Sequence, residues 1–119
     1  MTSNRSKGLV YVREVRKVYS DAGYLVEGPG YDVMFFSGAM RPVHKDYFEC
    51  FDLIVCKHNI LSGIQVTTLE NKSHRVAKLR EKGVVGYVWC RSRDGRKVEW
   101  RVFRVSGDDV VELPRTEAL

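Results

Sequence analysis

Two polar side chains interrupt apolar segments of this sequence at places where they could act together. Asp52 is the single charge within the almost continuously apolar run Phe51–Cys56, and Gln65 lies within the next extended segment, Gly63–Thr68. Because burial of an unpaired carboxylate is costly, such a side chain generally binds a metal ion, another cation or several hydrogen-bond donors. Oxygen donors of this kind suit a hard divalent ion such as Mg²⁺. Asp52 and Gln65 are therefore the candidate metal ligands.

Positive charge is concentrated in one part of the chain. The 119 residues carry 20 Lys and Arg against 15 Asp and Glu, a net charge of +5. The segment Lys72–Arg104 holds eleven Lys and Arg and three acids, so it contributes +8 and the rest of the chain contributes −3. Such a stretch favours a nucleic acid partner, because each neutralised phosphate releases condensed counterions. A solvated basic face without a partner is the alternative.

Periodicity and glycine positions predict the elements that would place these residues. Apolar residues at spacings of three and four predict a helix over Lys7–Ala22, ended by Gly23. Asp52 and Gln65 fall on the two strands of a predicted hairpin, with a connection of about six residues. The other expected elements are a strand at Tyr24–Glu27, an extended piece at Val33–Phe36, an irregular loop over Ser37–Tyr47, a helix from Asn71 or Ser73 to Lys82, strands at Val84–Cys90 and Arg96–Val105, and a loop from Ser106 onward.

These elements predict an α/β protein in which helices pack on a mixed sheet. The length is that of one domain, 1–119, with residues 1–6 and 106–119 as flexible ends. Five basic residues are the candidate nucleic-acid contacts, three on the second predicted helix and two in the loop before the hairpin. They are Lys72, Arg75 and Lys78 on the helix, and Arg41 and Lys45 in the loop.

Several classes of protein are disfavoured by the sequence. The three cysteines, Cys50, Cys56 and Cys90, are an odd number without a CxxC spacing, which indicates neither a disulfide framework nor a zinc site. The longest run free of charged residues, His58–Leu69, is too short to cross a bilayer. The N-terminal segment lacks the apolar block of a secretory signal. We therefore expect a cytoplasmic protein without a membrane partner.

Four short motifs together carry a family resemblance. They are Lys7-Gly8 at the start of the first helix, Ala22–Val26 at its end, Phe51–Val55, and Ile64–Thr67. With this order of elements, the chain from Lys7 to Val105 resembles the PD-(D/E)xK nuclease superfamily, and within it the archaeal Holliday junction resolvases and the Mrr-like branch. The resemblance implies a restriction-endonuclease-like fold with an αβββαβ core, in which Asp52 and Gln65 hold Mg²⁺. It also implies a homodimer that binds and cleaves double-stranded or branched DNA.

Two positions depart from the family pattern. The position of the motif lysine, which orients or activates the attacking water in such enzymes, is Thr67. The first-helix position that usually carries glutamate is Val12, and the nearest acid, Glu14, lies about 200° further around the helix. Mg²⁺-dependent phosphodiester cleavage therefore requires a lysine from elsewhere in the chain.

Three interpretations of this site stay open. In the first, Lys72 joins Asp52 and Gln65 as the catalytic set, with Lys78 and Lys57 as further candidates for the missing lysine. In the second, the catalytic set is lost, and the chain is a nucleic-acid-binding or structural protein of the same fold. In the third, Asp52 forms an ion pair with Arg41 or Lys45, and Gln65 and Thr67 belong to an ordinary solvent-facing strand edge.

Overall fold

The computed structural model describes residues 4–36 and 38–119, with the side chains of residues 8–30, 38–40 and 45–119. Two helices, two short 3-10 helices and eight strands make up the described chain. Their order is α1 (Asn4–Asp21), β1 (Leu25–Glu27), β2 (Tyr31–Phe36), β3 (Ala39–His44), β4 (Leu53–Lys57), β5 (Ile60–Thr68), η1 (Leu69–Asn71), α2 (Lys72–Lys82), β6 (Gly86–Asp94), β7 (Lys97–Ser106), β8 (Asp109–Leu113) and η2 (Arg115–Ala118).

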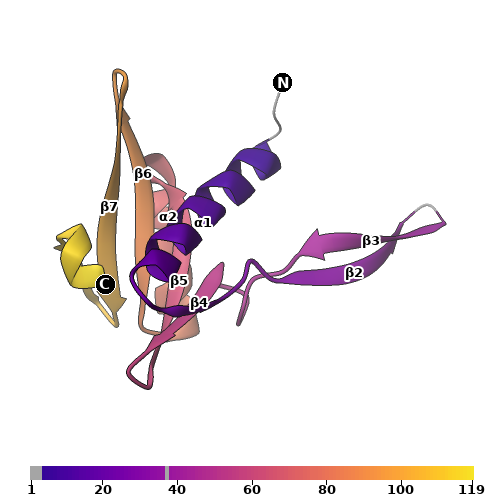
Figure 1. Ribbon diagram of the computed structural model, residues 1–119, viewed down its shortest axis with the longest axis horizontal. Coiled ribbons are helices and arrows are strands. Elements are labelled where there is room, and N and C mark those ends of the chain that lie inside the picture. The colour runs from indigo at the N-terminus through magenta and orange to yellow at the C-terminus, as the bar shows by residue number, and fades with distance from the viewer. Residues whose placement is uncertain (1–3, 37) are drawn as a thin grey trace.

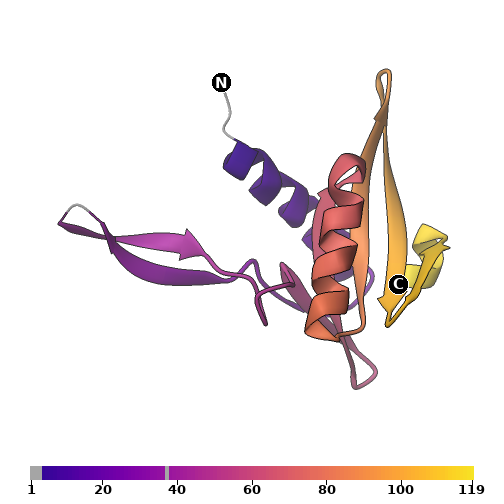
Figure 2. The ribbon, with the colours of Figure 1, turned by 180° about the vertical axis from the view of Figure 1, so that it is seen from behind.

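The main layer is a six-stranded mixed sheet with the strand order β1-β4-β5-β6-β7-β8. Strands β5 and β6 are parallel and are joined through α2, whereas the other neighbouring pairs are antiparallel. The two helices cover opposite faces of this sheet (Figures 1 and 2). The α/β class with a mixed sheet is thus confirmed.

Alternating side chains of the central strands form the two cores. On the α1 face, Val15 and Tyr19 pack against Trp89 of β6. On the α2 face, Val76 and Leu79 form a second cluster that includes Val88, Cys90, Phe103 and Val105 of β6 and β7. Neighbouring residues of a strand point to opposite faces, so an almost continuously apolar strand such as β6 is buried on both sides.

Both helices end where the sequence predicted. Gly23 follows α1 with φ +89°, and Gly83 follows α2 with φ +68° in the left-handed region. Glycine adopts these dihedral angles without a steric penalty, and the Gly83 N–H donates to the carbonyl of Arg80 at 3.0 Å. α1 begins earlier than predicted, at Asn4, so only residues 1–3 of the predicted flexible end lie outside the described residues.

The connection between β4 and β5 is shorter than predicted. The strands pair as far as Lys57 and Ile60, which leaves His58 and Asn59 as the turn. Their φ values are +54° and +63°, as in the type I′ turns that suit the twist of a hairpin. The expected six-residue connection is therefore wrong, because the turn requires only two residues in the left-handed region.

The predicted irregular loop over Ser37–Tyr47 is wrong for most of its length. Ala39–His44 forms β3, which pairs with β2 in a separate two-stranded sheet. This hairpin projects away from the main sheet (Figure 1). Pro42 favoured a loop in the sequence, but each strand of a two-stranded sheet is an edge strand, where a missing N–H need not break a hydrogen bond. The side chain of Arg41 lies outside the described side chains.

The C-terminal segment is ordered secondary structure, so the predicted loop from Ser106 onward is wrong. β8 pairs with β7 from Ser106↔Asp109 to Val102↔Leu113. Ala118 of η2 is only 6% exposed, and the hydroxyl of Tyr19 donates to its carbonyl at 3.4 Å. Asp108 and Asp109 favoured a loop in the sequence, but a tight turn at Gly107, with φ +59°, brings the chain back along β7.

None of the described helices is both long enough and apolar enough to span a membrane.

Candidate functional site

Asp52 lies directly before β4 and is held against β5. Asp52 is only 6% exposed, and its Oδ2 accepts a hydrogen bond of 2.8 Å from the backbone N–H of Val66. The Asp52 N–H donates to the carbonyl of Ile64 at 2.9 Å. Gln65, between these two residues, is 2% exposed. The structure thus brings Asp52 to the part of β5 that carries Gln65.

The ring of Phe51 fixes the backbone next to Asp52. A Cβ atom added at Gly63 or at Gly86 would come within 2.5 Å of this ring, so the ring lies directly over the two glycines of β5 and β6. On its other side, the Phe51 carbonyl accepts a hydrogen bond of 2.7 Å from the N–H of Tyr47. Asp52 is therefore positioned by packing of its neighbour as well as by its own hydrogen bonds.

Asp52 and Gln65 are the residues that could hold a divalent cation. Gln65 Oε1 is buried and accepts no hydrogen bond within the described residues, which is unusual for a buried amide. A carboxylate and an amide oxygen fit the preference of Mg²⁺ for oxygen donors, and water or substrate phosphates commonly complete its coordination. The described part of the chain holds no group of three His, Cys, Asp or Glu that could bind a metal. The oxygen atoms of Asp52 and Gln65 are of the kind that Mg²⁺ prefers, but they are only two protein ligands.

None of the three candidate lysines is placed beside Asp52. The ammonium of Lys57 donates to the carbonyl of Ala22 at 2.7 Å. The ammonium of Lys78 lies 3.9 Å from the carboxylate of Asp46. Thr67, at the position of the motif lysine, is 8% exposed, and Gln65 is 2% exposed on a strand inside the sheet. The alternative of a solvent-facing strand edge is therefore wrong.

The predicted catalytic role of Lys72 does not agree with its position. Its ammonium lies 4.3 Å from the ring centroid of Phe103, on β7. Strand β6 separates β7 from β5. The reason is helical geometry: positions 72, 76 and 79 share one side of α2, and Val76 and Leu79 face β6 and β7. Lys72 therefore packs on the aromatic ring instead of reaching Asp52.

The first helix supplies no carboxylate to this site. Val12 is 4% exposed and belongs to the core on the α1 face. Glu14 is exposed to solvent. Val12 therefore serves to pack α1 on the sheet.

A pocket of about 470 Å³ opens where β5 ends, between Gly8 and Tyr11 of α1 and the first turn of α2. Polar side chains on one wall come from the end of β5 and from the η1–α2 junction, whereas Tyr11 and Gly8 of α1 form the other wall. The lining residues are Gly8, Tyr11, Val66, Thr67, Thr68, Glu70, Asn71 and Arg75. Arg75 is among the residues predicted from the sequence, whereas the grouping of Thr67, Thr68 and Asn71 is not. The polar run at the end of a buried strand is the signal that could have indicated them.

An adjoining pocket of about 350 Å³ shares Thr68 and Glu70 with the first and is also lined by Arg91 and Arg93. The guanidinium of Arg91 lies 4.5 Å from the ring centroid of Tyr11. Arg75, Arg91 and Arg93 are thus opposed by a single acid, Glu70, around the two pockets. Lys45, the remaining loop candidate, is exposed.

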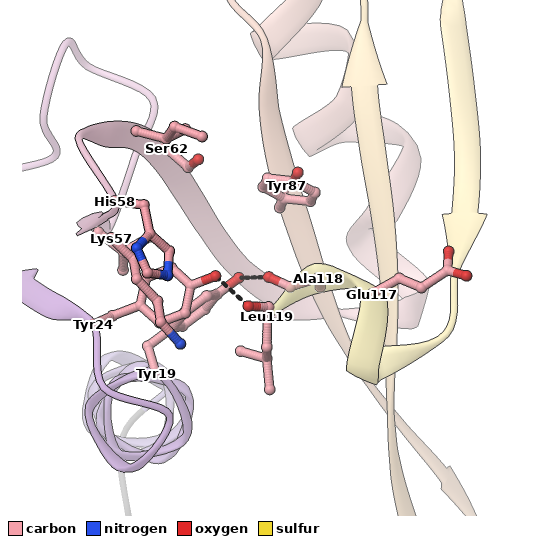
Figure 3. Close-up of a pocket in the computed structure, with 11 residues that line it drawn as sticks. Tyr19, Tyr24, Lys57, His58, Ser62, Tyr87, Glu117, Ala118 and Leu119 are labelled. Atoms are coloured by element: carbon pink, nitrogen blue, oxygen red, sulfur yellow. Dashed lines mark hydrogen bonds between the residues drawn. The ribbon is translucent and has the colours of Figure 1, made fainter.

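A third pocket, of about 320 Å³, lies near the β4–β5 turn and the C-terminal residues (Figure 3). Here the hydroxyl of Tyr24 donates to the carbonyl of Leu119, and Trp89 Nε1 donates to the hydroxyl of Tyr19 at 2.9 Å. Burial raises the pKa of the Tyr19 phenol well above its usual range. Glu117 points away from the tyrosines in Figure 3. The hydroxyls of Tyr19 on α1 and of Tyr24 just before β1 thus attach the C-terminal segment to the end of α1 and the residues that follow it.

The elements around Asp52 and Gln65 follow one another as α1, β1, β4, β5, α2 and β6, with the β2–β3 hairpin inserted after β1. This is an αβββαβ order in which the last two strands are parallel. Comparison with known protein families, with curated proteins and with solved structures found no match to this chain.

Proposed function

We propose that this protein is a DNA-binding, nuclease-like protein with a restriction-endonuclease-like fold. The observation that carries the proposal is the buried pair Asp52, directly before β4, and Gln65, on the antiparallel strand β5, within an αβββαβ order. Two polar side chains at these depths are costly in an ordinary core. A metal-binding ancestry accounts for both of them and for their place in the sheet.

The basic residues around the two adjoining pockets support DNA as the partner. Arg75, Arg91 and Arg93 place three guanidinium groups near Thr68, at the end of the sheet where β5 stops. Guanidinium groups bind phosphate oxygens through two parallel hydrogen bonds, and the backbone of DNA presents such groups at regular intervals.

Binding is tested by the fluorescence anisotropy of a labelled duplex and of a labelled four-way junction, each at 50 and 200 mM salt. We expect affinity to fall steeply with salt, because each phosphate contact releases counterions. An Arg93→Gln variant is expected to bind more weakly, and an Arg104→Gln variant, on β7 and away from the pockets, serves as the charge-matched control. Absent binding, or binding that is insensitive to salt, would refute the proposal.

Mg²⁺-dependent cleavage is a second candidate function, favoured by Gln65 Oε1, which is buried and accepts no hydrogen bond from any described residue. When bound, Mg²⁺ would activate water and stabilise charge on the phosphate. Asp52 and Gln65 would hold it. Thr67 lies at the pocket wall, so a Thr67→Lys substitution has room to restore the missing ammonium.

Plasmid nicking in Mg²⁺ or Mn²⁺ tests this second function with four proteins. They are the wild type, Thr67→Lys, the double variant Asp52→Asn/Thr67→Lys, and Ser62→Lys, which adds a lysine at the other end of β5. Metal-dependent nicking by the wild type or by Thr67→Lys, lost in the double variant and not gained in Ser62→Lys, supports a metal site. If neither the wild type nor Thr67→Lys produces nicks, the pair does not hold a catalytic metal and the protein is the non-catalytic binding protein.

We propose a homodimer as the DNA-binding form, because symmetric binding or cleavage of both DNA strands requires two equivalent sites. Strands β1 and β8 form the edges of the sheet and are available for such an association. Sedimentation velocity with and without duplex DNA tests this, and a monomer under both conditions would contradict it.

A further inference from the structure

The 470 Å³ pocket at the end of β5 gathers hydrogen-bond donors from three consecutive elements. Thr67 and Thr68 contribute hydroxyls, Asn71 contributes an amide, and Arg75 contributes a guanidinium. Glu70 is the single acid of the lining, and no ion pair joins it to Arg75 within the described residues. The polar wall of this pocket is therefore suited to an anion.

Arg75 is the charged residue of this lining with a buried donor that lacks an acceptor within the described residues. Its Nε is buried and makes no hydrogen bond within the described residues. A buried donor of a charged group that lacks an acceptor is expensive, and hydrogen bonds to such a group are stronger than those between neutral groups. An oxyanion in the pocket would supply an acceptor that the described residues do not.

The neighbouring side chains are oriented in a way that favours the same ligand. Asn71 Nδ2 donates to Thr68 Oγ1 at 3.3 Å, so the hydroxyl proton of Thr68 is directed elsewhere. Asn71 forms no side-chain cap on α2, although it occupies the capping position. The backbone N–H of Lys72, the first residue of α2, instead donates to the carbonyl of Leu69, in the turn that joins η1 to α2.

We propose that this pocket binds one phosphate group of the DNA backbone, with Arg75 as its principal ligand and Thr67, Thr68 and Asn71 as further donors. This assignment rests on the proposed function and makes it specific. Thr67 stands at the position of the missing motif lysine, and Arg75 lies in the same pocket, so Arg75 supplies the positive charge there. Lys72 packs on Phe103 and Lys78 pairs with Asp46, so neither lysine is part of this subsite.

The test combines two probes, a labelled DNA duplex and inorganic phosphate. Duplex affinity is measured against salt for the wild type, Arg75→Gln, Arg75→Lys and the control Arg104→Gln. Phosphate is titrated into ¹⁵N-labelled protein while the backbone amides of residues 67–75 are followed. Thermal unfolding checks that each variant is folded, and Arg75→Lys retains the charge if Arg75→Gln does not fold.

We expect Arg75→Gln to lower DNA affinity about tenfold and to reduce the salt slope by about one unit. Arg75→Lys is expected to restore the slope but only part of the affinity, because lysine lacks the paired donors. Phosphate should shift the amides of residues 67–75 in the wild type and not in Arg75→Gln.

Two other outcomes separate this inference from the proposed function. If the wild type binds DNA with a steep salt dependence and Arg75→Gln behaves as Arg104→Gln does, the phosphate subsite is overturned while DNA binding stands. If phosphate shifts these amides but no DNA is bound, DNA binding is overturned, and with it the assignment of the pocket to the DNA backbone in favour of a free phosphate ligand.

Discussion

Replacing Gly63 with alanine should destabilise the protein through Phe51, the residue that precedes Asp52. The added Cβ would lie 2.5 Å from three ring atoms of Phe51, whereas carbon atoms in contact prefer about 3.5–4.0 Å. The ring would have to move by roughly 1 Å in a buried site. Overpacking of this kind costs about 1–3 kcal/mol, and the lower backbone entropy of alanine offsets about 0.5–1 kcal/mol. We therefore expect the free energy of unfolding to fall by roughly 0.5–2 kcal/mol.

A double-mutant cycle with Phe51→Ala identifies the ring as the cause. Phe51→Ala alone should cost about 3–5 kcal/mol, because it empties a buried aromatic site. In that background Gly63→Ala should be neutral or stabilising, since the Cβ then enters open space. The coupling free energy between the two positions should therefore exceed about 1 kcal/mol, within the range seen for residues in contact.

Equilibrium urea unfolding measures these differences. Gly8→Ala is the matched control: Gly8 lies within α1 and nothing lies within 4 Å of an added Cβ, so this variant should gain about 0.5–1 kcal/mol. If Gly63→Ala is as stable as the wild type, or if it lowers the free energy of unfolding equally without the Phe51 ring, packing of that ring on Gly63 does not hold Asp52 in place.

Two further predictions follow from buried polar and thiol groups. Tyr19→Phe leaves Trp89 Nε1 without its acceptor and should lower the free energy of unfolding by about 1–3 kcal/mol. Because burial raises the pKa of the Tyr19 phenol, the folded state keeps its proton where the unfolded state loses it, so stability should decline as pH rises above about 10. Alkaline titration monitored by tryptophan fluorescence should show a shallower decline in Tyr19→Phe, and equal slopes would refute this cause. Burial raises the pKa of the Cys90 thiol to about 11, so in native protein at pH 8 a maleimide reagent should modify the partly exposed Cys56 and leave Cys90 intact until unfolding, as mass spectrometry of the digested protein will show.

Much of the secondary structure could be predicted from the sequence, because its signals are local. The apolar spacing of α1, the glycines that end both helices and the alternation in β7 each act over a few neighbouring residues. The missed elements, β3 and β8, follow turns at Gly38 and Gly107 and are recognisable only once a partner strand lies beside them. Strand pairing is a contact between segments, so it is not encoded in either segment alone.

The sequence by itself determined that Asp52 and Gln65 are polar positions within buried segments, since their apolar neighbours fix the environment of each. Only the tertiary structure decided that the Asp52 carboxylate accepts a hydrogen bond from Val66, fourteen positions along the chain. It also decided that Arg75 lines the pocket beside Thr67 while Lys72 packs on β7. Arg75 and Lys72 are about one turn apart on α2. The direction of each side chain depends on how α2 packs on the sheet. That packing is set by the contacts of Val76 and Leu79 with strands distant in the sequence.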